Sequence, residues 1–196
     1  MRIPIFPLNG AILFPKTNLP LNIFERRYVD MVDYSLSSER FIGMVQQKEN
    51  DELYSVGCYG KITVFNETPD KRYLINLEGI SCFKIIRETE TLHKFRICEI
   101  EIFENFSDPN LEDGLKSKIL DSFKKYNKVK NINVNFDDIA QLNIIDLLKF
   151  IVMVSPFDAS VKQMFLELKS NKDLYENILS TLEIELASNQ ESASIN

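Results

Sequence analysis

The first hundred residues alternate between short apolar runs and turn residues, a pattern that predicts β-strands. Runs at residues 62–65, 73–77, 83–86 and 95–102 are rich in β-branched and aromatic side chains, and several alternate with polar ones. Thr68-Pro69-Asp70-Lys71 predicts a hairpin turn, and Gly57, Gly60 and Gly79 predict bends or close backbone approaches. Many short strands at this spacing predict a curled sheet or a small barrel.

One amphipathic helix is predicted inside this β-rich region. Between residues 25 and 36, Tyr28, Met31 or Val32, and Leu36 fall on one helical face. Glu25 stands near the helix start, where the helix dipole favours a negative charge. We expect this helix to cap one end of the barrel.

After Pro109 the apolar residues recur with a period near 3.6, which predicts amphipathic helices packed on each other. Asp158 follows a helix-ending Ser-Pro-Phe sequence and is the predicted N-cap of a helix over residues 159–168. The periodic positions are Leu111, Leu115, Ile119 and Phe123, then Ile139, Leu142, Ile145 and Leu148, then Leu174, Ile178, Leu182 and Leu186.

This change of period divides the chain into predicted parts. Residues 1–107 are expected to form a β-barrel subdomain with its one capping helix, and residues 108–188 a helical bundle. Residues 189–196 are small and polar, which predicts a frayed tail. The fold class predicted from the pattern is α+β.

Composition limits which class of protein and which partners can be expected. The 196 residues are 44% hydrophobic, enough to bury a core, and the net charge of −6 with a pI near 5.0 repels nucleic acids and anionic membranes. Cys58, Cys82 and Cys98 each lie in an apolar, strand-like run, the usual setting of buried thiols in a reducing compartment. Pro4 and Pro7 interrupt the apolar start long before it reaches the length of a signal peptide. We therefore expect a cytoplasmic protein that binds neither membrane nor, as a rule, nucleic acid.

Several segments, in order along the chain, resemble the N-terminal substrate-recognition domain of the Lon protease family. That family joins a proline-punctuated apolar entry to a helix that begins I-F-E-x-R-Y, and its helical half carries an S-x-x-K-Q-x-x-L-E stretch. The matching segments are residues 4–8 (PIFPL), 13–15 (LFP), 19–28 (LPLNIFERRY), 41–45 (FIGMV), 56–62 (VGCYGKI), 69–73 (PDKRY), 79–83 (GISCF) and 160–167 (SVKQMFLE). The resemblance spans roughly residues 1 to 186.

Three residues depart from the family pattern. Arg26 stands where many relatives carry proline, Lys71 replaces the glycine of a P-D-G-R turn, and Cys82 replaces an arginine that often precedes Phe83. Losing that arginine removes a charged hydrogen-bonding contact. Any role that the family gives this arginine is therefore not expected here.

The resemblance implies a PUA-like open β-barrel followed by a C-terminal α-helical bundle. It also implies a non-catalytic module that binds unfolded or partner polypeptides, acting in protein quality control and alongside a separate protease. The Lon-like region of the cereblon family, which is similar, serves as a docking platform for a partner. A Lon protease needs its ATPase and its serine-lysine dyad in further domains downstream, so no enzyme is expected here.

Candidate chemistry in the sequence is sparse. No G-x-x-x-x-G-K-[ST] loop for ATP is present, and the cysteines are too widely spaced for a local zinc clip, so no cofactor or metal is expected. His93 is the only histidine and would be the base of an unrecognised hydrolase, but because no motif places a serine or cysteine with it, we interpret it as a surface residue. The pairs Asp137/Asp138 and Glu183/Glu185 are read as solvated helix residues.

A basic cluster over residues 124–130 (KKYNKVK) supports an alternative function, because PUA-like folds elsewhere bind RNA. In that reading the protein would be an RNA-binding PUA-like protein. A solvated helix end, with cations near the negative pole of the helix dipole, explains the same residues.

The segment from residue 13 to residue 24 is the best candidate for a binding surface. Pro15 and Pro20 lack backbone donors and hold the chain in an extended, partly exposed path, so its apolar side chains are not all expected to be buried. Either these side chains plug the end of the barrel, or they form a rim that meets apolar stretches of another chain beside a charged trio. The candidate polypeptide-binding residues are Phe14, Leu19, Leu21, Phe24, Glu25, Arg26 and Arg27.

Overall fold

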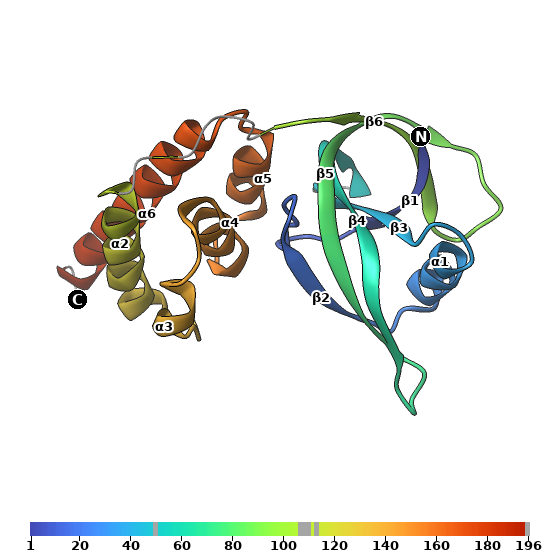
Figure 1. Cartoon of the computed structure of the whole chain (residues 1–196), viewed down its shortest axis with the longest axis horizontal. Coiled ribbons are helices and arrows are strands. Elements are labelled where there is room, and N and C mark those ends of the chain that lie inside the picture. Colours follow the sequence, from blue (N-terminus) through green and yellow to red (C-terminus); the bar gives the residue numbers. More distant parts are fainter. Residues whose placement is uncertain (49–50, 106–110, 112–113, 195–196) are drawn as a thin grey trace. The chain divides into compact units, whose positions relative to one another are not determined.

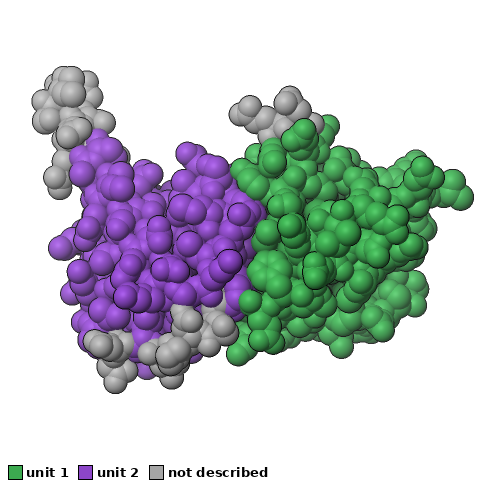
Figure 2. Space-filling view, turned by 90° about the horizontal axis from the view of Figure 1, so that it is seen from above, with its two compact units in different colours: residues 1–104 green, residues 105–196 purple. Residues whose placement is uncertain are grey.

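The computed structural model describes residues 1–48, 51–105, 111 and 114–194, with side chains as far as Ser188. The chain divides into two compact units, residues 1–104 and 105–196, which are coloured separately in Figure 2. The boundary expected at residue 107 lies outside the described residues. No helix in the described ranges is long and apolar enough to cross a membrane.

The described residues of unit 1 form six strands and one helix (Figure 1). In the sheet the strands run in the order β2-β5-β4-β3-β1-β6, and β5 also pairs with β6. Because β5 pairs with both β4 and β6, five strands form a ring, and β2 lies outside that ring along the first half of β5. This confirms the predicted barrel. The elements are β1 (Arg2–Pro7), β2 (Asn18–Ile23), α1 (Arg26–Leu36), β3 (Phe41–Gln47), β4 (Leu53–Glu67), β5 (Tyr73–Thr89) and β6 (Arg96–Phe103).

The barrel interior is a layer of buried apolar side chains contributed by β1, β3, β5 and β6. Its members are Ile3, Ile5, Val45, Phe83, Cys98 and Ile100. The strands approach so closely that Gly57 has no room for a side chain, since an added Cβ would lie 2.5 Å from the carbonyl oxygen of Met44. The predicted close backbone approach at Gly57 is thereby confirmed. Ile12, Leu13 and Phe14, in the loop before β2, are also buried.

Strands β4 and β5 are longer than the sequence pattern predicts, and Figure 1 shows them extending together into a hairpin arm. Two predicted runs, residues 73–77 and 83–86, are parts of the single strand β5, which passes through Gly79 without ending. The predicted turn is present, because the Lys71 amide donates to the Thr68 carbonyl (2.8 Å) and the Thr68 amide to that of Arg72 (2.9 Å). Lys71 has a left-handed φ of 63°.

The predicted helix after β2 is present as α1. Its buried face packs on the barrel, where the ring of Tyr28 meets the ring of Phe6 in β1 edge-on at 4.7 Å. Glu25 occupies the N-cap position, although its side chain makes no capping hydrogen bond. The hydroxyl of Tyr73 on β5 donates to Asp33 of α1 (2.9 Å), which joins the hairpin arm to the helix.

Unit 2 is a helical bundle, as expected. The rings of Phe123, Tyr126, Phe157 and Phe165 stack or tilt against one another in its core. Where α2 runs beside α6, Lys130 pairs with Glu185 at 2.8 Å. The helices are α2 (Gly114–Lys130), α3 (Phe136–Ile139), α4 (Ile144–Val154), α5 (Ala159–Glu167) and α6 (Asn171–Ser194).

One predicted periodic run in unit 2 is wrong as a single helix. Ile139, Leu142, Ile145 and Leu148 share a period, but the chain turns between α3 and α4. The side chain of Asn143 caps α4 by accepting from the Asp146 amide (2.9 Å), and an asparagine that bonds the backbone in this way begins a new helix rather than continuing one.

Two helix ends also bear on the predictions. Asp158 does occupy the N-cap position of α5, but it makes no side-chain capping bond. The backbone of α6 is helical as far as Ser194, so it includes most of the segment that we expected to fray. Fraying of that segment stays a prediction.

Candidate functional site

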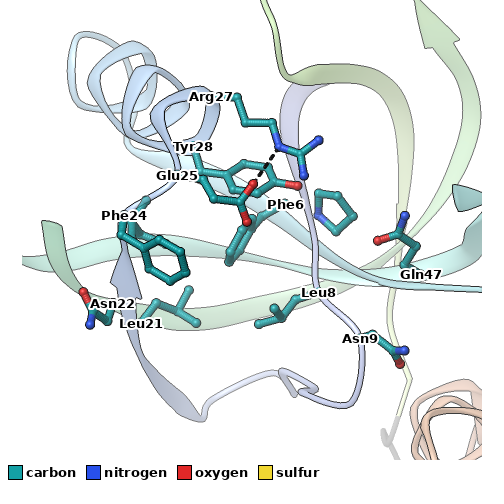
Figure 3. A pocket seen from close by; sticks show the side chains of 12 residues that line it. Phe6, Leu8, Asn9, Leu21, Asn22, Phe24, Glu25, Arg27, Tyr28 and Gln47 are labelled. Carbon is teal, nitrogen blue, oxygen red and sulfur yellow. Dashed lines mark hydrogen bonds and ion pairs between the residues drawn. The ribbon is translucent and has the colours of Figure 1, made fainter. Parts of the chain in front are cut away.

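A pocket of about 290 Å³ opens in unit 1 where three elements meet: the end of β1, the end of β2 and the start of α1 (Figure 3). Two continuous segments supply most of its lining: residues 6–9 around the end of β1, and residues 21–25 from β2 to the residue before α1. The lining residues are Phe6, Pro7, Leu8, Asn9, Leu21, Asn22, Ile23, Phe24, Glu25, Arg27, Tyr28 and Gln47.

The inner wall of the pocket is apolar. Phe6 and Tyr28 are almost fully buried and pack edge to face, so they form its aromatic base. Leu8 and Leu21 are half-buried, and Figure 3 shows them facing each other, Leu21 from β2 and Leu8 from the position directly after β1. An apolar side chain of another molecule would lose water on entering here, which is the usual source of binding free energy in such pockets.

Phe24 is the most unusual residue of the site. Its side chain is 68% exposed although it is a large aromatic group at the rim of a pocket whose inner wall is apolar. It follows β2 directly and precedes the N-cap residue of α1, so both neighbouring elements hold its backbone. An exposed aromatic ring on a fixed backbone is typical of residues that dominate the binding energy of protein interfaces.

The polar rim carries one charge of each sign. The Arg27 guanidinium pairs with the Glu25 carboxylate at 3.1 Å and also lies over the ring of Tyr28, 4.6 Å from its centroid. Burial raises the pKa of the Tyr28 hydroxyl, and the positive charge of Arg27 opposes that rise. Arg26 points its charge to Asp30 of the same helix (2.9 Å). These ion pairs are exposed, so they orient side chains more than they add stability.

The seven candidate residues that the sequence predicts lie in different environments in the structure. Leu21, Phe24, Glu25 and Arg27 line the pocket together. Phe14 is fully buried, so its side chain belongs to the core and has no surface to offer a partner. The pocket lining described above includes neither Leu19, which is half-buried, nor Arg26, which is exposed.

Other lining residues were not among the candidates. Phe6, Leu8 and Tyr28 lie in the segments that carry the family resemblance. The sequence therefore pointed to these residues, but we interpreted the segments as evidence for the fold and not for a binding site. Gln47 enters the site because β3 runs parallel to the end of β1, with Val45 opposite Pro7. No sequence pattern predicts that pairing.

The remaining sequence candidates have structural roles. The ring of His93 stacks on Phe95 at 4.7 Å and meets Tyr34 edge-on at 5.0 Å, an arrangement that holds the β5–β6 turn against α1. The three cysteines are buried, as predicted, and burial raises the pKa of the Cys98 thiol to about 11. Within the described ranges, no three His, Cys, Asp or Glu side chains come together as metal ligands.

In α2 the residues of the basic cluster, 124–130, lie in different environments and do not form one basic surface. Tyr126 is buried in the core of unit 2, and Lys130 is paired with Glu185. Lys124, Lys125 and Lys128 are exposed on α2. The interleaved aromatic residue therefore has no face available for stacking on a base.

Residues of the S-x-x-K-Q stretch lie in α5 and serve the packing of unit 2. Lys162 is nearly buried, and burial lowers the pKa of its amine while its Nζ donates to the Met153 carbonyl at 3.4 Å. The Gln163 amide donates to Glu167 one turn later at 2.7 Å.

Comparison with known proteins gives one consistent family. The profile of the family described as the ATP-dependent protease La (LON) substrate-binding domain matches residues 2–183. The Lon protease of Bacillus thuringiensis (strain Al Hakam) is 24% identical over 196 residues, which covers 93% of this chain and 24% of that protein. The Lon protease of Dictyoglomus thermophilum is 26% identical over 130 residues, which covers 63% of this chain and 16% of that protein. The chain thus spans about a quarter or less of the length of these relatives.

Two solved structures share the fold. A Lon N-terminal domain protein from Xanthomonas campestris superposes with a TM-score of 0.70 at 19% identity, over 92% of this chain and 98% of that one. The N-terminal domain of a Mycobacterium avium complex Lon protease superposes with a TM-score of 0.69 at 14% identity, over 95% of this chain and 98% of that one. At these identities the likeness concerns the fold alone.

Proposed function

This chain belongs to the family of the ATP-dependent protease La (LON) substrate-binding domain, and from that premise we propose that it is a non-catalytic module that binds unfolded polypeptide at the pocket between β1 and β2. The single observation that carries the proposal is Phe24, a ring 68% exposed beside a pocket with an apolar inner wall. Unfolded chains expose the large apolar side chains that folded proteins bury, and a pocket of this size accepts one or two such side chains.

A binding assay with a permanently unfolded chain tests this proposal. Reduced, carboxymethylated α-lactalbumin carrying a fluorophore is titrated with the protein in the absence of nucleotide, and binding is followed by anisotropy. Phe24→Ser is expected to weaken binding by about tenfold or more, the range found for aromatic residues that dominate an interface. Ile184→Ser is a matched control, because Ile184 is exposed to the same extent (69%) but lies on α6 and does not line the pocket.

Two results would contradict the proposal. The native protein could fail to bind the unfolded chain, or the two serine variants could lose affinity equally. The second result would mean that any exposed apolar side chain contributes alike and that the pocket is not the site.

A role in protein quality control, in the cytoplasm and with a separate protease, is the second step of the proposal. It is supported by the membership of the family and by the buried cysteines, which suit a reducing compartment. Adding the protein to a degradation assay with a Lon protease from the same organism should change the rate at which the unfolded chain is cut. Phe24→Ser should abolish that change, and an unchanged rate with the native protein would remove this step.

A further inference from the structure

Strand β2 is paired on one side only. It forms an antiparallel ladder with β5 from Asn18 opposite Glu78 to Ile23 opposite Tyr73, and among the described strands it has no neighbour on its other side. The exposed backbone of such an edge offers a row of hydrogen-bonding groups that another extended chain can pair with.

The residues that direct backbone groups to the unpaired side can be identified. The Thr17 carbonyl, immediately before β2, accepts from the Gly79 amide of β5 at 2.8 Å. Because backbone groups in an antiparallel strand point to alternate sides, residues 19, 21 and 23 also face β5, and Asn18, Pro20 and Asn22 face away. Pro20 agrees with this assignment, since proline has no donor and is tolerated where no ladder bond is needed.

The pocket runs along this unpaired edge. Leu21, Asn22 and Ile23 all line the pocket. The side chains of consecutive strand residues point to opposite faces of the strand, so a pocket that all three residues line must lie against the edge of β2. The opposite wall is also an interrupted edge: β1 pairs with β6 only as far as Ile5, so Phe6 and Pro7 have β3 as their one described strand neighbour. Figure 3 shows the pocket between these two strands.

We propose that the bound polypeptide lies extended in this pocket and adds a strand to the free edge of β2. Its backbone pairs with the outward groups of Asn22 and Pro20, and alternate side chains reach the apolar wall formed by Leu8, Leu21 and Phe24. The occupant is therefore a proline-free unfolded segment with apolar side chains at every second position. Since backbone pairing reads no side chain, one site can hold many different segments.

This inference rests on the proposed function and adds a mode of binding to it. Asn22→Pro tests the mode, because it removes the outward donor of residue 22 and repeats a residue that β2 already tolerates at position 20. Asn22→Thr keeps the donor and is the matched control. Both variants keep Leu21 and Phe24, and far-UV circular dichroism with urea unfolding verifies that each is folded.

The expected result is a loss of about tenfold in affinity for carboxymethylated α-lactalbumin in Asn22→Pro and a clearly smaller loss in Asn22→Thr, which changes the pocket-lining side chain but keeps the backbone donor. Equal affinity in both variants would overturn strand addition while leaving polypeptide binding intact. Failure of the native protein to bind the unfolded chain would overturn the proposed function itself.

Backbone-methylated peptides give a second, independent measurement that needs no variant of the protein. Two short peptides of one alternating apolar-polar sequence carry N-methyl groups on either the odd or the even residues. Strand addition predicts that one methylated peptide loses binding and the other keeps it, because only one edge of the peptide faces β2. Equal binding by the two methylated peptides would overturn the proposal. So would a dimer of the native chain, detected by sedimentation, that Asn22→Pro dissociates, because the occupant would then be a second copy.

Discussion

Gly79 on β5 lies so close to Phe14 that an added Cβ would come within 2.1 Å of the Phe14 carbonyl oxygen. The Gly79 amide and carbonyl also bond Thr17 and Lys16 of the same loop, each at 2.8 Å. This contact holds the loop before β2 against the barrel, and with it the strand that forms one wall of the pocket.

Gly79→Ala should therefore lower the free energy of unfolding by about 3 kcal/mol, since the clash is with backbone and cannot be relieved by a side-chain rotation. Urea denaturation measures the change. Gly114→Ala is the control, because Gly114 is the first residue of α2 and nothing lies within 4 Å of its added Cβ, so stability should stay within about 0.5 kcal/mol of the native value. A Gly79→Ala protein as stable as the native one would contradict the close approach.

Lys71→Gly should raise the free energy of unfolding by about 1 kcal/mol. Lys71 has a φ of 63° at the end of the β4–β5 turn, a conformation that costs an ordinary residue free energy and glycine none. Thermal or urea unfolding measures the gain. Lys71→Ala keeps the Cβ and should stay within about 0.5 kcal/mol of the native protein. A gain of the same size in both variants would mean that the lysine charge, and not the backbone, is the cause.

Phe14 and Phe24 should respond oppositely to truncation, although both lie in the segment that we expected to bind a partner. Phe14→Ala is expected to cost about 3–5 kcal/mol of stability, because the ring is fully buried and leaves a cavity. Phe24→Ala should change stability by about 0.5 kcal/mol at most, because its ring is mostly exposed. Urea unfolding of the two variants measures both values, and a large loss for Phe24→Ala would mean that its ring packs in the core.

The stability of the protein should fall between pH 9 and pH 11, in part through Cys98. Burial is the main cause that raises the pKa of this thiol from 9.0 to about 11, with Glu88 adding to the rise. Because the folded pKa is the higher one, the thiol stabilises the fold fully below pH 9, and this stabilisation is lost as the pH rises through 11. A shift of two pKa units corresponds to a loss of roughly 2–3 kcal/mol at most in the free energy of unfolding.

Cys98→Val removes this titration without removing apolar volume. Urea unfolding at pH 8 and pH 11 should show a smaller loss of stability in Cys98→Val than in the native protein, while the pKa values that burial raises at Tyr28 and Tyr175 affect both proteins equally. Identical losses would mean that the thiol does not titrate in this range.

The sequence alone determined the class of the fold, because that class depends on local periodicity. Alternating β-branched residues in the first hundred positions and a period of 3.6 after Pro109 correspond to the barrel and the bundle. The turn ending at Lys71 and the start of α1 were also predictable, since a few neighbouring residues determine them. The family followed from short motifs in their order.

Only the tertiary structure decided which residues share a site. Pairing of β1 with β3 and of β2 with β5 is set by contacts between distant segments, and these contacts bring Gln47 into the same pocket as Phe6 and leave one edge of β2 unpaired. For the same reason the sequence could not separate Phe14 from Phe24. Both are aromatic residues in a proline-rich stretch, and burial depends on what the rest of the chain packs against each of them.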